Sequence, residues 1–280
     1  GAGKSTTMNM ITGFIEPTQG KIIVNGNDIS KKTKKAKRQI GYMPENVPLY
    51  YELTVKEFVT YMAELKFVKR KDRKEEVQRV LRETGLEEVQ KKLIRNLSRG
   101  YKQRVSMAGA LVGNPDVIIL DEPTVGLDPK QITEIRNLIK ELGKKHTVIL
   151  STHILSEVSQ ICERVVIINK GKIIAVDTPE NLEKMTKEKN GICITVEDPK
   201  NNMRNLKDKI PQIEKIDMIK DNEDGTKQFV ITSSEGIDLR KKMFDILPKE
   251  DITIFELKKT ETTLEDAFIK LIDTKKEEEK

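Results

Sequence analysis

The chain begins with a glycine-rich turn that carries a lysine and two hydroxyl residues, and few folds accommodate such a turn. It is the second half of the phosphate-binding pattern G-x-x-x-x-G-K-[ST]. In that pattern backbone N–H groups surround phosphate oxygens, the lysine reaches the β- and γ-phosphates and the hydroxyl ligates Mg²⁺. The residues that the pattern assigns to a nucleotide are Gly1, Ala2, Gly3, Lys4, Ser5 and Thr6. Because this loop joins a strand to a helix, we predict an α/β nucleotide-binding protein, truncated so that the first glycine and its strand lie upstream of residue 1.

The composition fits a chain of two domains. Its 280 residues exceed one average domain; 34% are charged, 4% are aromatic and none is Trp. No apolar run reaches the length of a membrane span and the N-terminus carries no secretory signal pattern, so we expect a cytoplasmic protein. Cys162 and Cys193 lie among apolar residues and are interpreted as reduced core thiols.

Charge is unevenly distributed along the chain. Residues 1–189 carry 34 Lys and Arg against 24 Asp and Glu, whereas residues 190–280 carry 17 against 21, which indicates two modules. The basic run Lys31–Arg38 has two interpretations: contact with anionic lipid or nucleic acid, or a solvated surface loop. The second is favoured because no aromatic side chain lies between the charges to stack on bases.

Apolar periodicity predicts the elements of the first module. Two continuous apolar runs separated by a helical stretch are typical of buried parallel strands in a βαβ arrangement. The predicted elements are helices at 5–12 and 130–142, strands at 21–24, 117–120, 147–150, 165–168 and 172–176, a helical insertion at about 54–112 and a polar connecting helix at 179–189.

The pattern restarts after Asn190. Strand-like and helix-like segments follow in the order βαββαβ, which suggests a ferredoxin-like α+β domain. The segments are 192–196, 203–210, 213–219, 228–232, 237–247 and 252–257, followed by an amphipathic helix at 264–272. We therefore predict domains at 1–185 and 190–273 and a charged tail at 274–280.

Two consecutive carboxylates follow the strand predicted at 117–120. Ligand sites of parallel sheets lie at the carboxyl ends of their strands. Asp121 is therefore a candidate Mg²⁺ ligand, and Glu122 a candidate acceptor of the proton from attacking water. By itself an apolar strand ending in Asp-Glu is more often a strand terminus at a turn, but the phosphate-binding loop in the same chain favours the catalytic interpretation.

Five motifs in a fixed order resemble those of the ATP-binding cassette (ABC) family of transporter ATPases. They are Gly1–Thr6 for the Walker A motif, Leu97–Tyr101 for the signature motif, Ile118–Asp121 for the end of Walker B, Val125–Asp128 for the D-loop and His153 for the switch histidine. The resemblance covers about residues 1–185. It implies a P-loop NTPase sheet with a helical signature subdomain, followed in this chain by the small α+β domain.

The resemblance implies ATP and Mg²⁺ as ligands. Lys4, Glu122 and His153 would act in hydrolysis, and His153 would hydrogen-bond the γ-phosphate. The implied metal ligands are Ser5, Asp121 and Glu45. The chain is most similar to the bacterial exporter class of ABC systems, in which separate membrane subunits form the channel.

The resemblance also implies two protein partners. Ser98 stands where a helix N-cap is expected, so Ser98 and Gly100 would bind the ATP held by a second copy, giving an ATP-driven head-to-tail homodimer. An integral membrane permease is the second partner, and the segment around Tyr50 and Tyr51 resembles the one that receives it. No nucleic acid is expected, and the protein would lie peripherally on the cytoplasmic face of the membrane.

Three residues depart from the common family pattern. Glu45 stands where glutamine is usual, and Arg99 and Tyr101 replace a glycine and a glutamine of the signature motif. Carboxylate oxygen still ligates a hard cation, so activity is expected. Outside the motifs, His146 is interpreted as a favourable charge at the end of a helix.

Two other functions stay open at this point. A non-transport ABC ATPase acting on nucleic acid or ribosomes would explain the basic first module, although such proteins usually carry two cassettes or a long coiled coil. A regulatory subunit that binds nucleotide but barely hydrolyses it would explain Glu45.

Overall fold

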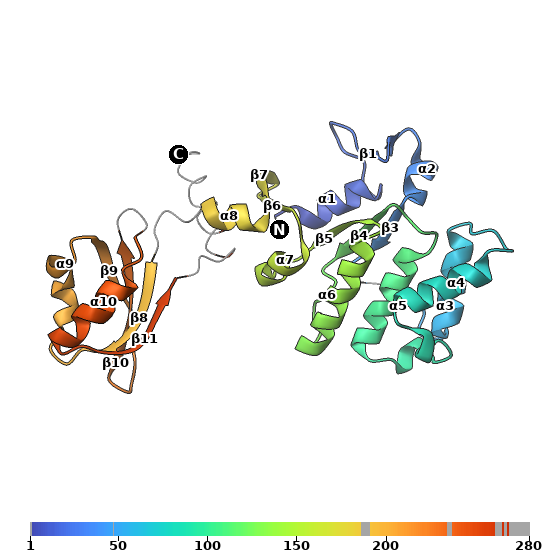
Figure 1. Ribbon diagram of the computed structural model, residues 1–280. Coiled ribbons are helices and arrows are strands. Elements are labelled where there is room, and N and C mark those ends of the chain that lie inside the picture. Colours follow the sequence, from blue (N-terminus) through green and yellow to red (C-terminus); the bar gives the residue numbers. More distant parts are fainter. Residues whose placement is uncertain are drawn as a thin grey trace. The chain divides into compact units, whose positions relative to one another are not determined.

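The computed structural model of the chain describes residues 2–46, 48–185, 191–233 and 237–260, together with Glu265 and Phe268 (Figure 1). Contacts within the chain divide it into two compact units. One comprises Gly1–Ile161 with Ile168–Ile173, and the other comprises Cys162–Ile167 with Ile174–Lys280. The domain limits 1–185 and 190–273 stay predictions. The helix expected at 264–272 lies outside the described residues except for Glu265 and Phe268, and the tail at 274–280 lies outside them entirely.

The first unit is built around a three-stranded parallel sheet of order β3-β4-β5. Its strands are β3 (Ile40–Met43), β4 (Val117–Asp121) and β5 (Thr147–Ser151), with a separate small pair of β1 (Ile23–Val24) and β2 (Asn27–Asp28). Its helices are α1 (Lys4–Ile11), α2 (Thr33–Arg38), α3 (Val55–Leu65), α4 (Arg73–Glu83), α5 (Arg99–Leu111), α6 (Pro129–Gly143) and α7 (Leu155–Ile161), with 3-10 turns at Glu87–Val89 and Ile94–Asn96. Strands β6 (Val165–Asn169) and β7 (Lys172–Asp177) pair with each other as predicted, and α8 (Pro179–Met185) follows.

Strand β4 lies at the centre of the sheet, and its apolar sequence reflects burial on both faces. Ile118 and Leu120 belong to the apolar core formed with α3, α5 and α6. Ile119 belongs to a second core with Met8 of α1. Figure 1 shows α1 on one side of the three strands and α5 and α6 on the other. Alternate side chains therefore enter opposite cores, as the continuous apolar run predicted.

The helical insertion predicted at 54–112 is present as α3, α4 and α5. Helix α3 begins at a capping box, in which the Thr54 hydroxyl accepts the Glu57 amide and the Glu57 carboxylate accepts the Thr54 amide. Val55, Phe58 and Val59 on one face of α3 are buried, in agreement with their helical spacing.

Among the described elements of the first unit, β2, α2, β3 and α7 were not predicted. The basic run was interpreted as a surface loop, but Thr33–Arg38 forms α2 with Ala36 fully buried. Strand β3 was missed because it is short and contains Gly41. A Cβ on Gly41 would lie 2.2 Å from the carbonyl oxygen of Ala110 in α5, so only glycine allows this strand to pack there.

The second unit contains a four-stranded antiparallel sheet of order β11-β8-β10-β9. Its elements are β8 (Gly191–Glu197), a 3-10 turn (Asn202–Asn205), α9 (Leu206–Lys209), β9 (Ile213–Asp221), β10 (Thr226–Ser233), α10 (Arg240–Ile246), a 3-10 turn (Leu247–Glu250) and β11 (Thr253–Lys259). Met203, Leu206 and Met243 pack with Ile194 and Ile231 of the sheet in one core. The chain order βαββαβ and the strand order confirm the predicted ferredoxin-like arrangement.

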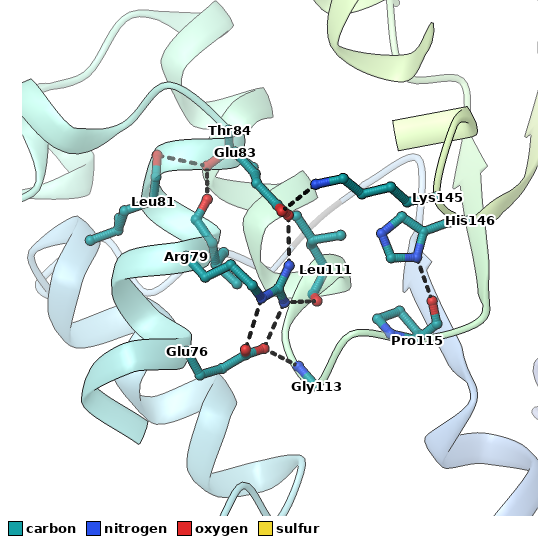
Figure 2. Close-up of polar contacts among 11 residues, drawn as sticks. Glu76, Arg79, Leu81, Glu83, Thr84, Leu111, Gly113, Pro115, Lys145 and His146 are labelled. Atoms are coloured by element: carbon teal, nitrogen blue, oxygen red, sulfur yellow. Dashed lines mark hydrogen bonds and ion pairs between the residues drawn. The ribbon is translucent and has the colours of Figure 1, made fainter. Parts of the chain in front are cut away.

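A network of charged side chains connects α4 to the rest of the first unit (Figure 2). Arg79 binds both oxygens of Glu76 at 2.8 and 2.9 Å and Glu83 at 2.6 Å. Glu76 also accepts the amide of Gly113 at 2.7 Å, and Glu83 accepts from Lys145 at 3.1 Å. The network therefore joins α4 to the end of α5 and to the segment that enters β5.

His146 lies beside this network and is buried, which the sequence did not indicate; its role as a favourable charge at the end of a helix stays a prediction. The residue is 8% exposed, and its Nδ1 lies 2.7 Å from the carbonyl oxygen of Pro115 (Figure 2). Position 146 directly precedes β5, so the packing of the sheet buries the imidazole. Of the two cysteines, Cys193 is buried and Cys162 half-buried; burial raises the pKa of the Cys162 thiol.

Replacement Glu76→Gln tests the network through its pH dependence. Burial raises the pKa of Glu76, but the hydrogen bonds from Arg79 and the Gly113 amide and the charge of Arg79 outweigh it, so the net pKa is lowered. Its contribution to stability is then complete above the unfolded pKa of about 4.3 and disappears as the pH falls through the lower folded value.

At neutral pH we expect Glu76→Gln to destabilise the first unit by about 1–3 kcal/mol. The difference from wild type should shrink below about pH 4. Thermal unfolding followed by circular dichroism at both pH values measures it. Glu141→Gln is the matched control, because Glu141 and its partner Lys144 are both 67% exposed. A difference independent of pH would contradict the assignment.

Candidate functional site

The N-terminus of α1 has the backbone geometry expected of a phosphate-binding turn. Gly3 caps the helix with φ of 102°, a left-handed conformation that favours glycine. A Cβ on Gly3 would lie 3.5 Å from the Cα of Gly171, whose amide donates to the Ala2 carbonyl at 3.0 Å. The first turn contains no acidic residue and no side chain caps it, so its amides are suited to an anion.

Of the predicted nucleotide-binding residues, Ala2–Thr6 lie in this turn. Lys4 is half-buried, and Ser5 and Thr6 are exposed. Ala2 is half-buried, and Gly1 lies outside the described residues.

The register of the sheet brings the residues after β3, β4 and β5 to one edge. Met43 pairs with Leu120 and Leu120 with Leu150, so the three strands end at the same level. Asp121 pairs with Ser151 one step further. Because carboxyl ends of parallel strands form the ligand site in α/β sheets, this edge is the candidate site.

Asp121 and Ser151 form a buried polar contact at this edge. Asp121 is 4% exposed, and its Oδ1 accepts a hydrogen bond from the Ser151 hydroxyl. The amide of Glu122 donates to both oxygens of Ser151, at 3.2 Å to the carbonyl and 3.1 Å to the hydroxyl. The negative field extends to β3, since burial and then the charge of Asp121 raise the pKa of Tyr42.

Glu122 and His153 are in direct contact. His153 Nδ1 lies 2.8 Å from Glu122 Oε2, and the Glu122 side chain is 12% exposed against 63% for His153. Glu122 has φ of 49°, a conformation that costs a non-glycine residue of order 1–3 kcal/mol and is often found at functional sites. The arrangement presents a carboxylate that an imidazole orients, which is suited to accept a proton. Both residues were predicted, but their contact was not.

Glu45 is exposed two residues after β3. Among the described residues no hydrogen bond or ion pair joins it to Asp121, Glu122 or Lys4. Its role as a metal ligand therefore stays a prediction. In the same part of the chain no group of three or more His, Cys, Asp and Glu has the geometry of a metal site.

The N-terminus of α5 carries the signature residues. Ser98 is exposed and caps the helix, with its hydroxyl accepting the Tyr101 amide at 3.4 Å. The first turn has no acidic residue. Gly100 is buried, and a Cβ there would lie 2.9 Å from Cδ of Gln131 in α6. The structure thus gives Gly100 a packing reason, while anion binding by Ser98 and Gly100 stays a prediction.

Two contacts unite the signature helix with the loop that follows Glu122. Gln103 of α5 donates to the carbonyl of Pro123 at 2.7 Å. The Arg99 guanidinium lies against Gly126, where a Cβ would come within 2.2 Å of its Cζ. Asp128 then caps α6 by accepting the Gln131 amide at 2.9 Å. Sequence reasoning identified Arg99 only as a departure from the family pattern and missed the role of Gln103.

The comparisons with known proteins agree with this geometry. The family model described as ABC transporter matches residues 1–125. The linearmycin resistance ATP-binding protein LnrL of Bacillus subtilis is 38% identical over 65% of this chain and 59% of its own length. The lipopolysaccharide export system ATP-binding protein LptB of Haemophilus influenzae is 37% identical over 65% of this chain and 77% of its own.

A solved structure shares the fold. The dimeric structure of an ATP-binding cassette in a post-hydrolysis state, bound to ADP and Pi, superimposes with a TM-score of 0.56 at 28% identity, covering 63% of this chain and 81% of that one. The chain therefore belongs to the ABC transporter family, and its first unit has the P-loop NTPase fold of an ABC-type ATPase. The chain spans 59% of the length of LnrL.

Proposed function

We propose that this chain is the ATP-binding and ATP-hydrolysing subunit of an exporter whose channel is formed by a separate membrane-spanning subunit. The observation that carries the proposal is the Glu122–His153 contact beside the buried Asp121, where β4 and β5 end. LptB is named as part of an export system and LnrL as a resistance ATP-binding protein, which supports export as the direction.

Each predicted residue has its own role in hydrolysis. Lys4 and the amides at the start of α1 hold the phosphates. Glu122 accepts the proton of the attacking water, and His153 orients that water. Mg²⁺ suits the oxygen donors Ser5 and Asp121, since it is commonly held by one or two carboxylates plus substrate phosphates, and Glu45 would add a further oxygen. When bound, the ion neutralises charge on the phosphoryl oxygens.

A second copy of the chain completes the site in this proposal. Ser98 lies exposed at the N-terminus of α5, a helix end with a positive dipole and no acidic residue in its first turn. Such an end attracts phosphate, and the ATP bound to the partner copy supplies one. One solved structure of an ATP-binding cassette is dimeric and bound to ADP and Pi, which supports association of two copies.

Docking to the membrane subunit is assigned to a tyrosine surface made of Tyr50, Tyr51 and Tyr61. These side chains are 51%, 50% and 38% exposed. The rings of Tyr50 and Tyr61 lie 5.4 Å apart, edge to face, and Lys102 of α5 lies 5.4 Å from the ring of Tyr51. Exposed aromatic groups of this kind are typical of protein interfaces, and Lys102 connects the surface to the helix that begins at Ser98. None of the described helices has the length and hydropathy of a membrane span. As the partner of a membrane subunit, the chain would lie on the cytoplasmic face of the membrane.

Replacement Glu122→Gln tests the hydrolytic role. Glutamine keeps the shape of the side chain and tolerates its backbone conformation but cannot take a proton. Steady-state phosphate release should fall about 100-fold or more, while calorimetry shows ATP binding within about three-fold of wild type. Size-exclusion chromatography with Mg-ATP should show an ATP-stabilised dimer. Glu141→Gln is the control, and near-normal turnover by Glu122→Gln would contradict the proposal.

Replacement Tyr51→Glu tests the docking assignment. A carboxylate in the tyrosine surface should abolish copurification of an integral membrane protein from detergent-solubilised membranes, while ATP binding in solution stays within about two-fold. Phe244→Glu is the matched control, because Phe244 is an exposed aromatic residue (65%) of the second unit. Copurification of RNA in place of a membrane protein would favour the non-transport alternative.

A further inference from the structure

Glu157 is a buried carboxylate that the proposed chemistry does not use. It lies in α7 and is 1% exposed, although it is only four residues after His153. Burying a carboxylate costs several kcal/mol unless partners compensate it, so its position requires an explanation.

The partners of Glu157 come from the two segments that carry the catalytic pair. Its Oε2 accepts the Thr124 hydroxyl at 2.7 Å and the Thr152 hydroxyl at the longer distance of 3.5 Å. Thr124 lies two residues after Glu122, and Thr152 directly precedes His153. Glu157 therefore connects the loop after β4 to the loop after β5, through a residue next to or near each member of the Glu122–His153 pair.

Thr152 has a second bond that fixes its loop. Its hydroxyl accepts the amide of Ile154 at 3.0 Å, so the backbone on both sides of His153 is tied to the same oxygen. Thr124 is 2% exposed and has little freedom to leave Glu157.

Arg136 of α6 balances the charge of Glu157. Its Nη2 lies 3.4 Å from Glu157 Oε1, and its Nη1 donates to Gln160 at 2.7 Å. Within the described part of the chain, Glu157 Oε1 and Arg136 Nε are buried without a hydrogen-bond partner. The pair is therefore held by charge attraction more than by hydrogen bonds, while the directional bonds of Glu157 are those to the two threonines.

We propose that Glu157 is a positioning residue for ATP hydrolysis, which links Thr124 to Thr152 and thereby sets the placement of Glu122 against His153. The inference rests on the proposed hydrolytic function but concerns residues to which that proposal assigns no contact with nucleotide or metal. Its physical basis is that a catalytic base displaced by about 1 Å can lose about 100-fold in rate without any loss of substrate binding.

Two variants test the link from opposite ends. Thr124→Val removes the hydroxyl without changing the shape or charge of the site, and Glu157→Gln removes the charge. Both should lower kcat about 10- to 100-fold and leave the KM for ATP within about two-fold, because binding depends on the α1 turn. Thr124→Ser, which keeps the hydroxyl, should retain near-normal kcat, and Thr133→Val, an exposed hydroxyl bound only to its own helix, is the control.

A second readout does not depend on hydrolysis. The chain has two histidines, so selectively labelled protein gives two imidazole signals in an NMR spectrum, and His146 is an internal reference buried elsewhere. The His153 ring signal should shift in Thr124→Val and Glu157→Gln, and the His146 signal should not.

The outcomes separate this inference from the proposed function. Wild-type protein without turnover contradicts the proposed function, and the His153 signal then decides the inference alone. If Glu157→Gln does not fold, Thr124→Val decides. Wild-type kcat and an unmoved His153 signal in the folded variants would overturn the inference, as would equal losses of kcat, ATP affinity and thermal stability, which indicate a merely structural role.

Discussion

The parallel pairing of β4 with β5 is the constraint on which the candidate site depends. Asp121 faces Ser151 in this register, and a shift by one residue would turn every side chain of the strand to the other face of the sheet. The shift would also remove Ile118 and Leu120 from the larger core. Burial of the apolar side chains of β4 thus fixes the register of the strand. The register in turn fixes the positions of Asp121 and Glu122 at its end.

Hydrogen bonds from helical residues also hold the loops that follow the strands of the sheet. Gln103 ties the signature helix to the loop after Glu122, and Glu157 ties the same loop to the one that carries His153. At the C-terminal end of α5, Arg79 of α4 donates to the carbonyl of Leu111 at 3.2 Å. The segment expected to meet a second copy, at Ser98, and the segment that holds the base therefore share one set of contacts. In the proposed dimer, closure of the site by a partner copy would act on Glu122 through packed side chains of the same unit.

The sequence was sufficient for the elements whose signal is local. The runs 117–120 and 147–150 are predominantly apolar and form β4 and β5, and the segments that follow Asn190 form a ferredoxin-like sheet. The phosphate-binding turn carries its own geometry, since Gly3 adopts the left-handed conformation that its motif requires.

Features set by distant contacts escaped prediction. Gly41 is explained by Ala110, which lies 69 positions later in the sequence, and the burial of His146 by Pro115. The roles of Ser151 and Glu157 depend on the direction in which each polar side chain points, and the periodicity of a sequence does not indicate that direction. A signal existed only for Ser151 and Thr152, which directly precede the predicted His153.

The distances from bound nucleotide to His153 and to His146 test directly whether the edge of the sheet is the nucleotide site. Mn²⁺ with a non-hydrolysable ATP analogue broadens NMR signals of nearby nuclei, and β5 separates His146 from His153 by roughly 15 Å of strand. If His153 lies at the nucleotide site, its ring signal disappears on addition of the complex while the His146 signal persists. Broadening of His146 alone, or an unaffected His153 when calorimetry shows the nucleotide bound, would contradict it.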